Sequence, residues 1–174
     1  MRLVQEAFNT HAMGLYAALG FEVKEPLARV VGRPRSVPPA GVEIRPLRAG
    51  DLEACAGICR RVHGITRTGD LQDALAHFRT VAVVRDGRLV AYTYEVFRGT
   101  LAWGVAEREA DMHALLTGAA RALDLPLAFL LPTRQASFFR WCLDEGVRVE
   151  KPLTLMAMGQ YQEPRGCWFP SGFY

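Results

Sequence analysis

Three side chains in this sequence are of types that could move a proton to or from a substrate. His63 ends a predicted helix and Glu95 lies near the end of a predicted strand, so either could serve as a general base. Cys142 could serve as an acid or a nucleophile, but no basic residue stands at helical spacing to lower its pKa. Each has a structural alternative: a histidine placed by the helix dipole, a solvated carboxylate and a packed thiol.

Two further cysteines, Cys55 and Cys59, lie one helical turn apart and could form half of a metal site. No second Cys or His pair with ligand spacing completes that site, so we expect small apolar residues on a helix face and no metal. Together with Cys142 and Cys167 they are too few and too unevenly spaced for a disulfide framework in 174 residues. Reduced thiols and a cytoplasmic location are therefore predicted.

The bulk composition limits the domain count and the partners. A chain of 174 residues that is 50% hydrophobic can bury one good core. No apolar run approaches the roughly 20 residues that span a bilayer, and the N-terminus lacks the apolar centre of a signal peptide. The 21 basic and 18 acidic side chains are interspersed and give a net charge of only +3, so neither nucleic acid nor a membrane is an expected partner.

The elements that must position these side chains follow from hydrophobic periodicity and turn signals. The predicted strands are 42–46, 80–85, 88–97, 100–106, 127–131 and two within 147–158, and the predicted helices begin at Asp51 and Asp70 or span 110–123 and 135–144. Asp86-Gly87 predicts a tight hairpin. The order predicts an α/β domain (α+β in some schemes) with a mixed, mostly antiparallel sheet and helices on both faces.

The N-terminal segment forms a separate predicted unit. Leu3 to Phe8 suits a strand, Asn9 can cap the helix that follows, and this helix ends at Gly20. A strand from Phe21 to Val31, interrupted by Pro26 and therefore broken or bulged, completes the unit. The pattern therefore predicts a strand-helix-strand arrangement before the main domain begins.

A Pro-rich linker, residues 33–41, separates this unit (residues 1–32) from a complete domain at 42–174. A shift of 126 residues superimposes the unit without a gap on a second strand, capped helix, glycine and proline-broken strand near the C-terminus. The shift aligns Asn9 with Gln135, Gly20 with Gly146, Val23 with Val149, Pro26 with Pro152 and Leu27 with Leu153. Only four of these matches are identities, so chance similarity of two common units stays an alternative.

The segment NTHAMGLYAALGFE, from Asn9 to Glu22, resembles the closing helix of an acetyltransferase domain of the GNAT superfamily, with its asparagine, tyrosine and LGF ending. RVHG at 61–64, LLPTRQASFFRWCLDEG at 130–146 and the tail YQEPRGCWFPSGFY from Tyr161 resemble the second domain of bacterial tandem GNAT proteins. The resemblance implies a GNAT-like fold, acetyl transfer from acetyl-CoA to an amine, and residues 1–32 as the C-terminal piece of a first domain.

The resemblance also implies roles for two residues of the N-terminal unit. Tyr16 falls where the family has the tyrosine that protonates the leaving thiolate, and Asn9 falls where an asparagine lies near the pantetheine arm of acetyl-CoA. Each has an alternative, since Tyr16 is also the aromatic end of an amphipathic helix and Asn9 is its cap. The shift of 126 places Cys142 at the tyrosine position of the second copy.

The second copy departs from the family at the position of the cofactor's pyrophosphate. Family members have a glycine-rich turn before the third helix of the fold, where free amides and the helix dipole meet the phosphates. This sequence has VAEREADMHAL at 105–115, with Glu107, Glu109 and Asp111 in that place. These carboxylates could cap the helix themselves and would repel an anion. The second domain is therefore expected not to hold acetyl-CoA in the usual way.

Two functions remain open from the sequence. The first is the weakly active or inactive C-terminal portion of a tandem GNAT acetyltransferase that acts on a small-molecule or peptide amine. The second is a non-catalytic interaction or regulatory module of the same fold. A homodimer or a missing first domain would cover the apolar face of the N-terminal unit. The tail from Tyr161 to Tyr174 is expected to dock as an extended ribbon on its own sheet edge, the missing domain or another subunit.

Overall fold

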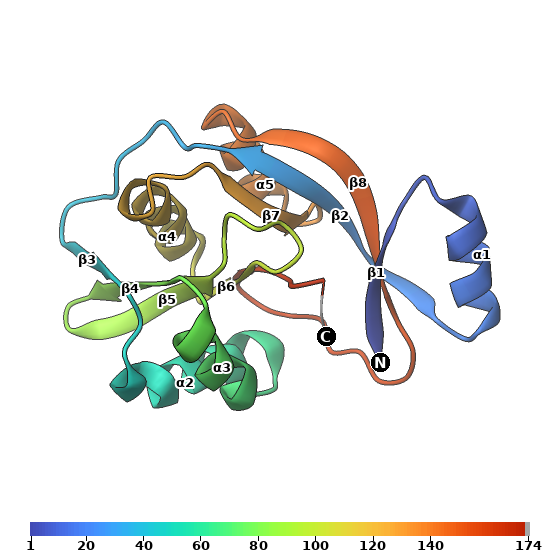
Figure 1. Cartoon of the computed structure of the whole chain (residues 1–174), viewed down its shortest axis with the longest axis horizontal. Helices are drawn as coiled ribbons and strands as arrows, with labels where there is room; N and C mark the ends of the chain where they lie inside the picture. The colour runs from blue at the N-terminus through green and yellow to red at the C-terminus, as the bar shows by residue number, and fades with distance from the viewer. Residues whose placement is uncertain (173–174) are drawn as a thin grey trace.

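The computed structural model describes residues 1–172, which form two β-sheets with helices packed against them (Figure 1). The strands are β1 (Arg2–Glu6), β2 (Glu22–Gly32), β3 (Val42–Arg45), β4 (Thr80–Arg85), β5 (Arg88–Tyr94), β6 (Trp103–Ala106), β7 (Leu127–Pro132), β8 (Arg148–Ala157) and β9 (Cys167–Phe169). The helices are α1 (Thr10–Ala18), α2 (Leu52–His63), α3 (Thr68–His77), α4 (Glu109–Ala122) and α5 (Ala136–Asp144), with a 3-10 turn at Ala49–Asp51. Within residues 1–172, no helix is long and apolar enough to cross a membrane.

The first sheet has the order β3-β4-β5-β6-β9 and is antiparallel throughout. Because strand side chains alternate between faces, Val81 and Val83 pack with α4, whereas Ala82 packs with α2 and α3 on the other face (Figure 1). Asp86 and Gly87 connect β4 to β5 with φ angles of 51° and 72°, which confirms the predicted hairpin.

The second sheet has the order β1-β8-β2-β7 and meets the first at one junction. There the amide of Ala128 donates to the carbonyl of Val96 at 2.7 Å, and the amide of Gly99 donates to the carbonyl of Ala128 at 2.8 Å. Beyond this junction β6 and β7 belong to different sheets. The predicted α/β fold with flanking helices is confirmed, while the sheet expected to be continuous is divided here.

The N-terminal unit and its C-terminal counterpart have the same local structure. The shift of 126 residues carries the bounds of α1 onto those of α5. Both helices are followed by a glycine in the left-handed region, with φ angles of 91° at Gly20 and 87° at Gly146. In Figure 1, α1 projects at one end of the molecule, whereas α5 lies against the main body.

The strands of the two units interleave in the second sheet. The same shift carries every pair of β1 with β8 onto a pair of β7 with β2. It also carries the ladder between β2 and β8 onto itself, and Leu27 pairs with Leu153, its own counterpart. The two units are therefore related by a local twofold axis at the Leu27–Leu153 pair.

Of the two forms predicted for this strand, broken or bulged, β2 has the bulged one. The strand is continuous through Pro26, and an irregularity lies between Val23 and Glu25. Pairing of β2 with β7 begins at Leu27, so Pro26 is paired only with β8 and the missing N–H is tolerated. For the same reason Pro152 does not divide residues 147–158 into two strands, and β8 is a single strand.

Two predicted strand ends are also corrected. β5 ends at Tyr94 rather than at residue 97, because Glu95 has a φ angle of 49° and turns the chain out of the sheet. β6 begins at Trp103 rather than at residue 100, because the amides of Leu101 and Ala102 form turns with the carbonyls of Arg98 and Gly99.

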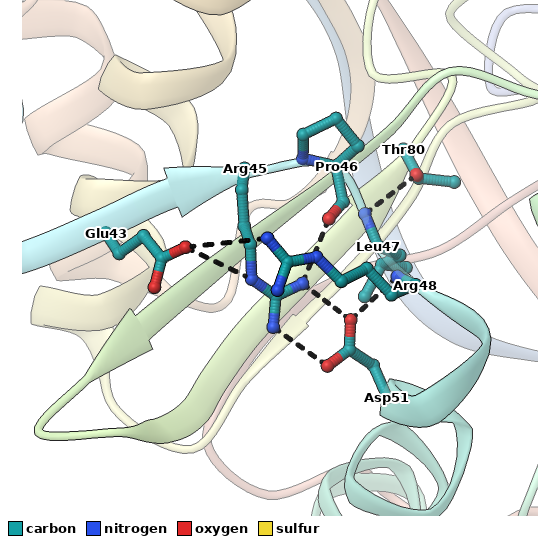
Figure 2. A network of polar contacts seen from close by, with 7 residues as sticks. All are labelled: Glu43, Arg45, Pro46, Leu47, Arg48, Asp51 and Thr80. Carbon is teal, nitrogen blue, oxygen red and sulfur yellow. Dashed lines mark hydrogen bonds and ion pairs between the residues drawn. The ribbon is translucent and has the colours of Figure 1, made fainter.

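Asp51 is not the side-chain cap of α2 that the sequence predicts. Its carboxylate accepts from both terminal nitrogens of Arg45, at 2.6 and 2.9 Å, and from the backbone amide of Arg48 at 2.7 Å (Figure 2). The hydrogen bonds from Arg45 lower the pKa of Asp51. Asp70 likewise lies inside the first turn of α3 and pairs with Arg67 at 2.6 Å. Neither carboxylate caps its α-helix, because both pair with arginines, and Asp51 instead closes the capping box of the 3-10 turn at Ala49–Asp51 through the amide of Arg48.

Candidate functional site

The space between β6 and β7, beyond the junction of the two sheets, holds the C-terminal tail of the chain. β9 pairs antiparallel with β6, with Phe169 opposite Gly104 and Trp168 opposite Val105, and its other side contacts β7. Of the three surfaces predicted for the tail, Cys167–Phe169 cover its own sheet edge, and Phe173 and Tyr174 lie outside the described residues. We call this space, bounded by β6, β7 and Gln135, the β6–β7 slot.

Gln135 closes the slot on the side opposite β6. Its Nε2 donates to the carbonyl of Trp168 at 2.6 Å, and its Oε1 accepts from the amide of Trp168 at 3.1 Å. The equivalent Asn9 instead caps its own helix by accepting from the amide of Ala12 at 3.0 Å. Gln135 makes no such cap. Its side-chain amide therefore binds both backbone groups of one tail residue, as a neighbouring strand would.

The carboxylates at the start of α4 are engaged by the protein itself. Glu107 is ion-paired with Arg61. Asp111 is buried and accepts from Arg85 and Arg108, at 2.9 and 3.1 Å. None of them caps the helix, because the N-cap position is Arg108 and has no side-chain hydrogen bond. The expectation that they cap α4 is wrong, and arginine side chains neutralise two of them.

Glu109 connects the start of α4 to the start of α5. It accepts a hydrogen bond from the hydroxyl of Ser137, and His113 lies 3.4 Å from its other carboxylate oxygen. A pocket of about 550 Å³ lies beside this link at the outer end of β9, where Arg140 and Gly166 are also in its lining. An anion entering between the two helix starts would meet the charge of Glu109, with Arg134 and Arg140 also in the lining of the pocket.

Solved structures with the same architecture were found by comparison. The chain matches a protein of Pyrococcus horikoshii provisionally described as an acetyltransferase, with a TM-score of 0.72 and 13% identity, over 98% of this chain and 58% of that one. It matches GCN5-related N-acetyltransferases from Sphaerobacter thermophilus (TM-score 0.57, 15% identity, 89% of this chain and 58% of that one) and Kribbella flavida (0.56, 20%, 91% and 67%). The chain has the GNAT fold.

The GNAT fold is established here by structure rather than by sequence. No family model and no curated protein sequence matches the chain. The chain spans 58% of the length of the Pyrococcus and Sphaerobacter proteins, which is less than two-thirds. The likeness therefore concerns part of each of these longer proteins.

Within the GNAT fold, Tyr16 lies on the projecting helix α1, and Asn9 is the N-cap of that helix. Tyr16 is half-buried, and its ring stands edge-on to that of Phe21 with centroids 6.0 Å apart. Helix α1 buries none of its residues. The roles implied for these two residues by the family stay predictions.

His63, at the end of α2, lies next to the β6–β7 slot. Its ring packs between the rings of Trp103 and Trp168, at centroid distances of 4.6 and 5.3 Å. Burial, reinforced by the charges of Arg2 and Arg67, lowers the pKa of His63 to about 3. The imidazole is therefore neutral at neutral pH and is only 2% exposed, so it serves as a packing element in the arrangement described.

Glu95 is buried at the end of β5. Its Oε1 accepts from the backbone amide of Arg79 at 2.9 Å, and its Oε2 lies 3.5 Å from Nε of Arg98. Among residues 1–172, no contact joins Glu95, His63 and Tyr16 to one another. The three residues predicted as catalytic are thus placed on separate elements, and a catalytic role for each stays a prediction.

The cysteines are buried free thiols. Burial raises the pKa of Cys142 and Cys59, and it raises that of Cys55 to about 12. A protonated thiol is a weak nucleophile and a poor metal ligand, so these side chains behave as apolar packing groups. In the part of the chain that the structure describes, no group of three or more His, Cys, Asp or Glu side chains is arranged to hold a metal.

Sequence reasoning missed the role of Gln135. The shift of 126 residues does point to this position, because it aligns Gln135 with the helix cap Asn9. The alignment gives no sign that the longer side chain reaches the tail, since that contact depends on where residue 168 lies in space.

Proposed function

We propose that this chain is the C-terminal portion of a longer GNAT-type acyltransferase that transfers acetyl from acetyl-CoA to an amine of a small molecule or peptide. In this proposal the N-terminal unit contributes Asn9 and Tyr16 to an acetyl-CoA site. The other residues of that site belong to a first domain that precedes residue 1. Residues 42–174 form a second domain that holds no acetyl-CoA. The GNAT fold and the matches to parts of longer acetyltransferases support the activity. The four free thiols fit a reducing compartment such as the cytoplasm.

The difference between the two symmetry-related helices carries this proposal. On α5, Phe138 and Cys142 are completely buried against the body of the second domain. Their counterparts on α1, Ala12 and Tyr16, are partly exposed. Since the backbones of the two units correspond, α1 presents to solvent the face that a domain body covers on α5. This supports a second body of the same kind next to α1.

Two features of residues 42–174 support the absence of acetyl-CoA from the second domain. The extended tail fills the β6–β7 slot. The link between Glu109 and Ser137 places a carboxylate between the starts of α4 and α5. A pyrophosphate there would lose its hydration and gain a repulsive neighbour.

The proposal is tested on the product of the reading frame that continues upstream of Met1. We expect acetyl transfer from acetyl-CoA to amines in that product. Tyr16→Phe should lower kcat at least about 100-fold, because the leaving thiolate loses its acid. Cys142→Ala, at the equivalent position of the second copy, should leave kcat unchanged. A stop codon immediately upstream, or a Tyr16→Phe variant as active as the parent, would contradict the proposal.

A second function, a non-catalytic interaction module, is favoured by one observation. Apolar side chains on and near α1 are exposed, with Phe8, Leu15 and Leu19 at 63%, 55% and 60%. Light scattering on the chain alone distinguishes the two functions. A dimer that Leu15→Glu dissociates, together with no acetyl transfer by the longer product, would favour the interaction module.

A further inference from the structure

The tail in the β6–β7 slot is bound through its backbone on two opposite sides, as an extended peptide ligand would be. Along one side, its backbone continues the sheet at the edge of β6. Along the other side, the amide of Gln135 binds the N–H and C=O of Trp168. Both flanks of the slot therefore select an extended chain that carries amide groups, whatever its side chains.

Side-chain selection comes from a pocket built around Phe169. A Cβ on Gly104 would overlap the ring of Phe169, so glycine at this position of β6 leaves the room that the ring occupies. The ring packs against that of Phe129 with centroids 4.6 Å apart, and it is fully buried. Residues that carry most of the energy of an interface characteristically fill well-packed, desolvated pockets, as this ring does.

Both ends of the segment are fixed by hydrogen bonds, one end to the last turn of α2 and the other to the loop that precedes β6. The amide of Arg165 donates to the carbonyl of Val62 at 2.7 Å. The amide of Gly172 and the hydroxyl of Ser171 donate to the carbonyl of Thr100, at 2.7 and 3.1 Å. The preceding stretch from Met158 to Pro164 has no regular structure, and its residues Gly159, Gln160 and Gln162 are exposed. It can serve as a tether between β8 and the slot.

We propose that residues 165–172 are a tethered peptide ligand, and that the β6–β7 slot is a peptide-binding site for an extended segment with phenylalanine at the Gly104 position. The site does not depend on acyl transfer, and it would be present in either function proposed above. A small molecule with an extended amide-bearing arm could pair with the same flanks, but it offers nothing for the Phe169 pocket. The observations therefore favour a peptide.

The proposal is tested by cutting the tether in the folded chain. A recognition site for a specific protease is inserted between Gln162 and Glu163, both exposed, and the purified protein is cleaved. A fluorescein-labelled synthetic peptide of residues 163–174 is then added to the cut and uncut proteins, and binding is followed by anisotropy. We expect saturable binding to the cut protein, as the cleaved tail exchanges, and none to the uncut protein.

Matched peptides distinguish binding through the Phe169 side chain from non-specific adsorption of the peptide to the cut protein. Phe169→Ala in the peptide should weaken binding on the order of 100-fold, because a fully buried ring is removed. Arg165→Ala is the control, since that side chain is exposed and only its backbone amide is bound, and it should bind like the parent. Equal binding of the Phe169→Ala peptide and the parent would overturn the proposal.

Two further results, the effect of cleavage on folding and competition by acetyl-CoA, also support or overturn the proposal. If cleavage unfolds the chain and added peptide restores its circular dichroism, the tail is a ligand that stabilises its site, which supports the proposal. If the added peptide does not refold the cut protein, the tail is an inseparable part of the core, and the proposal is overturned. Displacement of the labelled peptide by micromolar acetyl-CoA would assign the slot to an acyl carrier instead of a peptide, and would also overturn it.

Discussion

The two strand-helix-strand units of this chain share a backbone and differ in what surrounds them. β1-α1-β2 and β7-α5-β8 correspond in pairing register, and the bounds of α1 and α5 coincide under the shift of 126 residues. Helix α5 buries Phe138 and Cys142, whereas α1 buries none of its residues. Helix α5 is therefore integrated in a core and α1 lies outside it, although β2 of the same N-terminal unit contributes Ala28 and Val30 to the main core.

This difference teaches that a local repeat determines backbone geometry but not chemistry. Glycine recurs at both helix ends because each turn needs a positive φ angle. Leucine recurs at residues 27 and 153, which pair with each other in the ladder of β2 and β8. The residues at the cap position are used differently, since Asn9 binds its own helix and Gln135 binds the tail. Function has to be argued for each copy separately.

The largest expected change in the free energy of unfolding comes from replacing Phe138 on α5 with alanine, the residue at the equivalent position 12 on α1. Phe138→Ala reproduces Ala12 in the second copy and should lower the free energy of unfolding by about 3–5 kcal/mol, because a buried ring leaves a cavity. Leu15→Ala on α1 is the matched control and should change it by less than about 1 kcal/mol, since that side chain is already exposed. Urea denaturation measures both. Equal losses would show that α1 is as integrated as α5.

The next prediction tests the local twofold axis. Leu27→Ala and Leu153→Ala remove the two members of the central pair, both of them buried in one small cluster. Each should lower the free energy of unfolding by about 2–4 kcal/mol, and the two losses should agree within about 1 kcal/mol. A large loss for one variant and none for the other, by urea denaturation, would show that the symmetry is one of backbone path only.

Much of the fold could be predicted from the sequence. The hairpin at Asp86-Gly87, the helix ends at Gly20 and Gly146 and the shift of 126 residues all rest on local signals, and the structure has each of them. What could not be predicted depends on residues far apart in the chain. The division of the sheet and the place of the tail are set by pairing between segments separated by more than sixty residues in sequence.

The candidate site was less predictable than the fold for the same reason. His63 has the residue type of a general base, but Trp103 and Trp168 enclose it, and Trp168 is more than a hundred positions away. Asp51 has the residue type of a helix cap, but Arg45 takes its carboxylate. Residue type and spacing name the candidates, and only long-range packing decides how each is used.

Acid should destabilise the body of the second domain through His63. Its folded pKa of about 3 lies below the ordinary value of 6.5 that applies to the unfolded chain. The unfolded state therefore binds the extra proton as the pH falls below 6.5, and stability is lost toward pH 3. Between pH 7 and pH 5 this amounts to about 2 kcal/mol. His63→Phe keeps an aromatic ring and should remove that part of the loss in urea denaturation, and an unchanged pH dependence would contradict the assignment.

The smallest expected effects concern the two cap positions. Asn9→Ala should lower the stability of α1 by about 1 kcal/mol, because the amide of Ala12 loses its acceptor. Gln135→Ala should lower the stability of the tail by a similar amount, about 1 kcal/mol, since Trp168 loses two partners. Hydrogen exchange should be faster at Ala12 in the first variant and at Trp168 in the second. Faster exchange at α5 in the second variant would show that Gln135 acts as a helix cap after all.

The central claim is our proposal that this chain, which has the GNAT fold, holds no acetyl-CoA at the β6–β7 slot, and calorimetric titration of the chain with acetyl-CoA tests it most directly. The account predicts only heats of dilution, because the tail fills the β6–β7 slot and Glu109 stands between the two helix starts. Saturable micromolar binding of acetyl-CoA to the intact chain would contradict it.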